Sequence, residues 1–122
     1  MKIQKKISIV VLGLLLSNAS FAGSVENATI TSIYCAEEGG ENKCVIFVDK
    51  DVINPPPCHN THPTNRKRMM FRVDNEIGKA MLSIALTAYS TNKLVHMSGK
   101  GICTIQGDTE DMDGIQILNS VE

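Results

Sequence analysis

The chain has 122 residues, of which 43% are hydrophobic, and its 12 basic and 13 acidic side chains leave a formal net charge of −1. A chain of this length predicts one domain rather than several. The slightly acidic balance argues against a nucleic-acid-binding protein, because contacts to phosphates require a basic face.

The first 22 residues have the three-part layout of a secretory signal peptide. A positive region with Lys2, Lys5 and Lys6 precedes an apolar run over residues 7–16, and Ser20-Phe21-Ala22 offers small residues where a signal peptidase reads. The run has about half of the ~20 residues that a membrane-spanning helix requires. We therefore expect cleavage after Ala22 and a single domain over residues 23–122, secreted or periplasmic. Without the three leader lysines, nine basic residues oppose 13 acidic ones, a net charge of −4.

The first part of the mature chain predicts a β-hairpin. Residues 27–35 alternate and are rich in β-branched side chains, as in a strand, with Ile30 and Tyr34 on one face and Ile33 on the other. A turn over residues 37–42 contains Gly39-Gly40, where positive φ costs little. The continuous apolar run of residues 44–48 predicts the second strand.

An irregular segment follows the hairpin. The prolines of Asn54-Pro55-Pro56-Pro57 cannot donate backbone hydrogen bonds, so residues 52–65 are expected to form a long loop. Residues 69–73 then predict a third strand.

The hydrophobic period next changes from two to 3.6 residues, which predicts a helix from about Glu76 to Thr91. Asp74 or Asn75 can cap its first turn, and Asn92 suits the left-handed position at its end. The apolar face of this helix is expected to consist of Ile77, Ala80, Met81, Ile84, Ala88 and Tyr89.

Short strands complete the chain. Residues 93–98 predict a strand, Gly99-Lys100-Gly101 a turn, and residues 102–106 a further strand. An acidic loop over residues 107–114 leads to a last strand at 115–118. The predicted fold class is mainly β with one helix (α+β), in the order β-β-β-α-β-β(-β).

All four cysteines lie in the mature part, and an even number in an exported domain predicts two disulfides. The hairpin brings Cys35 close to Cys44, which leaves Cys58 to pair with Cys103. The alternative is a zinc site, with Cys58, His59 and His62 completed by His96 or Cys103. Oxidation during export and the lack of a paired Cys-x-x-Cys knuckle favour the disulfides, so we expect no metal.

No catalytic motif or cofactor site stands out in the sequence. A nucleophilic serine usually lies in a sharp glycine-flanked turn, but there is no Gly-x-Ser-x-Gly, and Ser83 and Ser90 fall in the predicted helix. We expect His59 and His62 to lie in an exposed loop and His96 to face outward from its strand. A non-enzymatic protein without a cofactor is therefore predicted.

Two charged segments have simple interpretations. The acidic stretch Asp108–Gly114 lacks the full alternation and the distal Glu of a calcium-binding loop, so a solvated loop is expected. The basic cluster Arg66-Lys67-Arg68, with Arg72 close by, is typical of a solvated loop or a protected strand edge.

Aromatic residues are scarce in the mature chain, which has no tryptophan. Phe47 and Tyr89 fall in apolar patterns and are expected in the core, whereas Tyr34 and Phe71 are candidate surface rings. Because sugars stack on aromatic faces, this scarcity argues against a strong lectin.

Two stretches resemble the B subunits of pertussis-type and subtilase-type bacterial toxins. Ile33-Tyr34-Cys35 with eight residues before Cys44 is similar to their opening disulfide hairpin, and residues 79–95 are similar to their central helix and next strand, although Asn92 replaces a usual Gly. The helix-to-strand stretch, with residues 99–103 and 107–111, also resembles short exported bacterial proteins of unknown role. The resemblance implies a small OB-like β-barrel of five or six strands, a pentamer and a glycan ligand, but it assigns no ligand-binding residue.

The sequence thus predicts a secreted, non-catalytic binding module. We expect it to resemble a toxin B subunit and to recognise a host glycan or protein. The alternative is a periplasmic protein-binding, inhibitor or structural protein with no sugar ligand.

Overall fold

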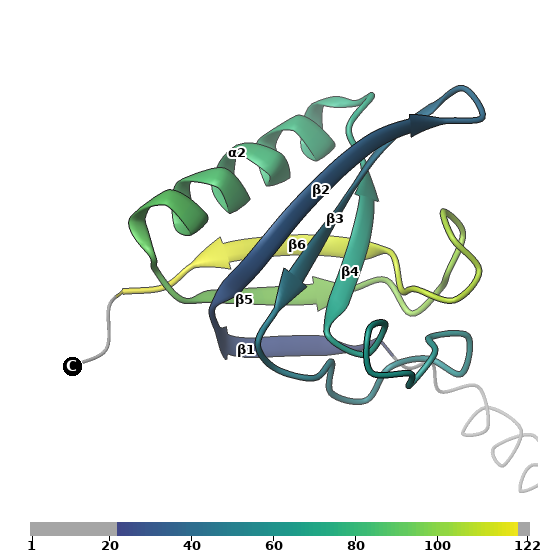
Figure 1. Cartoon of the computed structure of the whole chain (residues 1–122), viewed down its shortest axis with the longest axis horizontal. Coiled ribbons are helices and arrows are strands. Elements are labelled where there is room, and N and C mark those ends of the chain that lie inside the picture. Colours follow the sequence, from purple (N-terminus) through teal and green to yellow (C-terminus); the bar gives the residue numbers. More distant parts are fainter. Residues whose placement is uncertain (1–21, 120–122) are drawn as a thin grey trace, which may run out of the picture.

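The computed structural model describes residues 22–119, so the predicted signal peptide lies outside the described part except for Ala22. In chain order, the elements are β1 (Ser24–Ala28), β2 (Ile30–Glu38), β3 (Glu41–Val48), β4 (Arg68–Arg72), α2 (Glu76–Thr91), β5 (Val95–Gly99) and β6 (Met112–Ile117) (Figure 1). Over this range, no helix has the length and apolarity needed to cross a membrane.

The strands form two antiparallel three-stranded sheets, ordered β1-β5-β6 and β2-β3-β4. Only Thr29 separates β1 from β2, so one bent segment supplies the first strand of both sheets. An isolated parallel bridge between Met70 and Asp111 links β4 to the residue before β6. The prediction of a mainly β fold with one helix is confirmed, and no closed barrel is seen between residues 22 and 119. The predicted order is wrong, because four strands rather than three precede the helix and two follow it: the single strand predicted at residues 27–35 is divided into β1 and β2 by the bend at Thr29.

The predicted strand at residues 102–106 is wrong. The amides of Thr104 and Ile105 donate to Asp111 Oδ1, at 3.0 and 3.3 Å, rather than to a neighbouring strand. This segment is therefore part of a loop, and β5 pairs instead with β6, which begins at Met112 rather than at Ile115.

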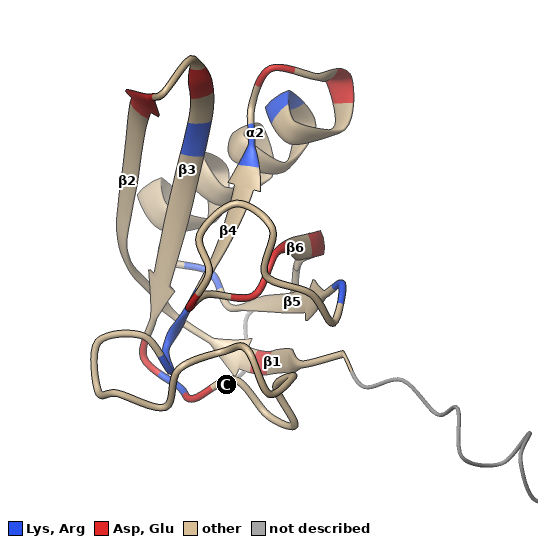
Figure 2. Cartoon of the chain, turned by 90° about the vertical axis from the view of Figure 1, so that its right-hand side faces the viewer, with Lys and Arg blue, Asp and Glu red and all other residues tan. Residues whose placement is uncertain are grey.

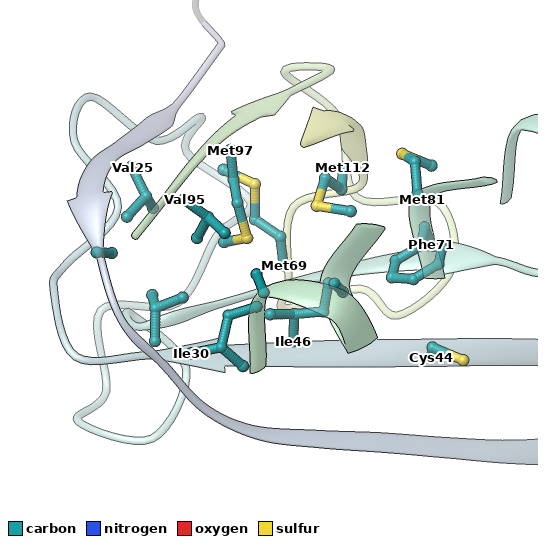
Figure 3. Packing of buried hydrophobic residues seen from close by; sticks show 14 of the residues in the cluster. Val25, Ile30, Cys44, Ile46, Met69, Phe71, Met81, Val95, Met97 and Met112 are labelled. Atoms are coloured by element: carbon teal, nitrogen blue, oxygen red, sulfur yellow. The ribbon is translucent and has the colours of Figure 1, made fainter. Parts of the chain in front are cut away.

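A single core fills the space between the two sheets and α2. Met97 and Met112 from one sheet, Met69 from the other and Met81 from the helix converge in it (Figure 3). Flexible thioether side chains suit this role, because they fill the irregular gaps left where two small twisted sheets meet. The core includes residues from every element: Val25, Ala28, Ile30, Cys44, Ile46, Val48, Met69, Phe71, Met81, Ala85, Ala88, Val95, Met97 and Met112.

Helix α2 packs against β2 and β6, one strand of each sheet (Figure 1). Of the two candidate caps, Asn75 accepts from the Gly78 amide at 2.7 Å, and Asn92 takes the expected left-handed conformation. The predicted apolar face is partly wrong, since the buried residues are Gly78, Met81, Ala85 and Ala88. A Cβ at Gly78 would lie 1.8 Å from the Arg72 carbonyl oxygen, so only a glycine allows the first turn of the helix to lie this close to the end of β4.

Both predicted disulfides, Cys35–Cys44 and Cys58–Cys103, are present. The first joins directly opposed residues of β2 and β3. The second ties the proline-rich loop to the loop between β5 and β6, which carries the acidic segment. The two disulfides therefore hold the hairpin and the irregular end of the molecule separately.

Candidate ligand-binding groove

The face of the β2-β3-β4 sheet that points away from the core is hollowed into a groove of about 260 Å³. Val45 and Met70 are buried at its floor without belonging to the core cluster. The residues that line the groove come from all three strands and from the loop after β5: Tyr34, Ala36, Glu38, Lys43, Val45, Phe47, Arg68, Met70 and Gln106. We refer to this set as the groove.

A β-bulge at the start of β2 decides which side chains reach the groove. Ile30 lies opposite Val48 and Ser32 lies opposite Phe47, so β2 has one extra residue there. An extra residue reverses the alternation of a strand. Ile30 therefore points into the core and Tyr34 into the groove, although an unbroken alternation would place both on the same face.

The aromatic residues differ from expectation in three cases. Phe71 is buried in the core, whereas Phe47 is only partly buried and lines the groove. Tyr89 is half exposed on α2, outside the core. The prediction for Tyr34 is confirmed, since 62% of its surface is exposed. The groove thus contains one exposed ring and one partly buried ring.

Arg68 is held in place on three sides. Its guanidinium lies 5.8 Å from the centre of the Phe47 ring, its Nε donates to Thr109 Oγ1 at 3.0 Å, and its Nη2 lies 3.5 Å from Asp108 Oδ1. Arg68 lies on β4, an edge strand of its sheet, as one of the two interpretations of the basic cluster predicted. The other interpretation, a solvated cluster, is wrong for Arg68. It holds for the neighbouring Arg66 and Lys67, which pair with the exposed Asp51. A fixed guanidinium at the groove wall can donate hydrogen bonds with little further loss of entropy.

Residues of both charge signs lie near the end of the β2–β3 hairpin (Figure 2), and two of them, Glu38 and Lys43, line the groove. Lys43 Nζ lies 2.7 Å from Glu38 Oε1, and this hydrogen bond lowers the pKa of the Glu38 carboxyl. Glu38 is therefore an ionised acceptor next to a donor. Gln106 adds an amide from the loop between β5 and β6.

His59 does not lie in an exposed loop as predicted, because only 3% of its surface is exposed. Its Nδ1 accepts from the Glu110 amide at 2.9 Å, which places the proton of the neutral ring on Nε2. Burial lowers its pKa, since the charged imidazolium is poorly solvated there. His59 therefore acts as a neutral structural link between two loops.

The acidic segment is also different from the solvated loop that was expected. Thr109, Glu110 and Asp111 are buried, and Asp111 accepts from the amides of Thr104 and Ile105 and from the Thr104 hydroxyl. Asp108 accepts from the Asn60 amide through its backbone carbonyl. The Asp111 carboxylate and the Asp108 carbonyl thus hold the loops at this end of the molecule together.

The zinc interpretation does not fit the structure. Cys58 and Cys103 are joined to each other, and no group of three or more potential metal ligands occurs between residues 22 and 119. His62 is exposed as predicted, and His96 alternates with two core residues and thus faces outward.

Ser90 lies in α2, as the sequence predicted, and its hydroxyl donates to the Leu86 carbonyl of the same helix.

Comparisons with known proteins identify no relative. No family model matches the chain, and neither a curated protein nor a solved structure is detectably similar to it.

Proposed function

We propose that the mature chain is an exported, non-catalytic binding module that takes a glycan in the groove. The observation that carries the proposal is the exposed Tyr34 ring beside an apolar floor and a charged rim. A sugar ring has an apolar face that stacks on an aromatic side chain and hydroxyls that need donors and acceptors. Tyr34 supplies the first, and Arg68, Lys43 and Glu38 supply the second.

The two disulfides fit an oxidising location, either outside the cell or in the periplasm. They also make the groove rigid, because Cys35–Cys44 bridges the two strands that provide most of its lining. Rigid sites bind with less loss of conformational entropy. Export, signal cleavage and the absence of catalysis are parts of this proposal.

We further propose that the architecture is OB-like. Three features support it: the bent β1–β2 segment shared by both sheets, the helix between β4 and β5, and the parallel Met70–Asp111 bridge between the sheets. In OB folds, oligosaccharides and oligonucleotides bind on the face of strands two and three, between neighbouring loops. The groove lies on the outer face of β2, β3 and β4, which supports the OB-like proposal, and the net negative charge favours a sugar over a nucleic acid.

The resemblance to toxin B subunits adds a pentameric assembly to the proposal. Helix α2 leaves Leu86 and Tyr89 half exposed on its outer side, next to the partly buried Leu82. Apolar side chains at this spacing form a stripe along a helix, which a second copy of the chain could cover. Light scattering of the mature protein measures the assembly, and a monomer would remove the pentamer from the proposal.

The alternative function is binding of another protein by strand addition. It is favoured by β2, a nine-residue edge strand that has β3 as its one strand neighbour in the described chain and is mostly exposed. The edge of a sheet can pair with an extended peptide through backbone hydrogen bonds wherever no other element covers it.

A glycan array followed by calorimetry tests the proposal. The oxidised mature protein is screened, and the best glycan is titrated as a soluble oligosaccharide so that assembly does not change the affinity per site. Replacing Tyr34 by Ala removes the stacking ring and is expected to weaken binding at least about tenfold, corresponding to roughly 1.4 kcal/mol. Ile77→Ala is the matched control, since it removes an exposed apolar side chain on α2 that lies outside both the groove and the Leu82–Leu86–Tyr89 stripe, and it should leave the affinity unchanged. Equal losses in both variants, or no glycan bound at all, would leave strand addition as the better proposal.

A further inference from the structure

The carboxylate of Glu110 is completely buried and only half satisfied. Its exposed fraction is 0%, and its Oε2 accepts from the amides of Gly23 at 2.9 Å and Gly101 at 2.8 Å. Its Oε1 has no hydrogen-bond partner among the described residues. A buried carboxylate without a counter-charge is costly, so this site requires a donor that the described chain does not supply.

Glycines surround this carboxylate because no side chain would fit. A Cβ at Gly99 would lie 2.0 Å from Glu110 Oε2, and one at Gly23 would lie 2.5 Å from Glu110 Oε1 and 2.6 Å from a methyl group of Val52. Gly23 is fixed on both sides, since its carbonyl accepts from the Gly99 amide and the next residue, Ser24, pairs with Ile53. The backbone nitrogen of Gly23 is therefore held against the carboxylate.

The chain passes from solvent into this buried site between two consecutive residues. Ala22 is exposed and Gly23 is buried. The peptide bond between them is the one that the leader pattern predicts to be cut, and its nitrogen is the atom that contacts Glu110.

We propose that cleavage between Ala22 and Gly23 creates the missing partner, an α-ammonium on Gly23 that forms a buried ion pair with Glu110. A leader peptidase adds one water molecule across the bond while the exported chain is unfolded. Ala22 leaves as a carboxylate, and the Gly23 nitrogen, with its added protons, becomes a –NH₃⁺ group. One amide donor is thereby replaced by three donors and a positive charge, enough for both oxygens of Glu110.

This ion pair forms only when the mature chain begins at Gly23, so the folded state is most stable with that N-terminus. If the chain began one residue earlier, Gly23 would keep a neutral amide with a single donor, as in the uncut chain. If it began at Ser24, the nitrogen that contacts Glu110 would be lost. The ion pair rests on the proposed signal cleavage but not on the groove or its glycan, so either proposal can fail without the other.

The test compares two exported proteins, one beginning at Gly23 and one retaining Ala22, each with Glu110 or with Glu110→Gln. An acylating reagent labels α-amines in the folded and in the urea-unfolded proteins, and mass spectrometry measures the extent. Labelling of the Gly23 amine should be on the order of tenfold or more slower in the folded state, because it requires local opening. The amine of the Ala22 protein should react at nearly the same rate in both states.

Thermal unfolding provides a second readout. With Glu110, retaining Ala22 should lower the Tm, whereas with Glu110→Gln the two N-termini should give nearly equal Tm values. Glu26→Gln, an exposed change on β1, is the matched control and should preserve the difference. If Glu110→Gln does not fold, the comparison of α-amine labelling between the two proteins that keep Glu110 still tests the ion pair. Equal labelling of the Gly23 amine in both states, or an exported protein whose sequenced N-terminus is not Gly23, would overturn the proposal.

Discussion

Removing the Cys58–Cys103 disulfide should destabilise the protein more than removing Cys35–Cys44. The two bridges close loops with sequence separations of 45 and 9 residues. The entropy of loop closure in the unfolded chain then assigns about 4 kcal/mol to the long-range bridge and about 3 kcal/mol to the hairpin bridge. Against a total stability of about 5–15 kcal/mol, either loss is severe.

The structure adds a local signature to this difference. The long-range bridge joins the loop that carries His59 to the loop that carries Glu110, whose amide donates to His59. The same pair of loops is held by the Asn60 amide, which donates to the Asp108 carbonyl. Both amides should therefore lose protection from hydrogen exchange when this bridge is removed, while the hairpin bridge should not affect them.

Urea unfolding and hydrogen exchange of the Cys58→Ala/Cys103→Ala and Cys35→Ala/Cys44→Ala proteins measure these effects. With a slope of about 2 kcal/mol per M urea, the expected losses lower the midpoint by about 2 M and about 1.5 M. A larger loss for the hairpin variant, or unchanged exchange at Glu110 and Asn60 in the long-range variant, would contradict this prediction.

Three further predictions concern single side chains. Burial lowers the pKa of His59 in the folded protein, whereas the unfolded chain keeps the ordinary value of 6.5. The contribution of His59 to stability should therefore be full above pH 6.5 and fall below it, because the unfolded state takes up the proton first. The Tm measured against pH should show a smaller acid-dependent loss in His59→Gln, but an unchanged loss in the exposed control His62→Gln. Gly99→Ala would place a Cβ 2.0 Å from Glu110 Oε2 and should lower the free energy of unfolding by about 2–3 kcal/mol. In the control Gly107→Ala the new Cβ meets nothing within 4 Å, so the free energy of unfolding should change by less than about 0.5 kcal/mol. Asn75→Ala removes the cap of α2 and should cost about 1 kcal/mol in urea unfolding, and a loss below a few tenths would show that the Gly78 amide finds another acceptor.

The parts of the fold that were predicted correctly depend on nearby residues. A period of 3.6 residues, an Asn before it and an Asn after it define α2, because capping and helical periodicity act within one or two turns. The Cys35–Cys44 pairing follows in the same way from a short turn between two strands. Such local patterns also identified β3 and β4 to within a few residues.

The groove could not be derived from the sequence, because it depends on which face of the sheet each residue occupies. Residues 44–48 are apolar without interruption, so their order does not indicate that Phe47 points outward while Ile46 points inward. The bulge near Ile30 reverses the pattern of β2, and nothing in the local sequence marks it.

The buried polar cluster escaped prediction for another reason. His59 and Glu110 lie 51 residues apart, and each is surrounded by polar and loop-forming residues that usually indicate exposure. The glycines at positions 23 and 99 were the available signal, since both are needed to leave space for the Glu110 carboxylate. Recognising their role requires knowing that β1, β5 and the acidic segment meet.

Mapping the bound glycan by NMR tests most directly whether the groove is the ligand-binding site. The best glycan from the array is titrated into ¹⁵N-labelled mature protein, and the shifts of the backbone amides are followed. If the glycan binds in the groove, the largest changes are expected at Tyr34, Val45, Phe47 and Gln106, with little change along α2. Changes that gather on α2 or elsewhere, or no change with any glycan, would contradict binding in the groove.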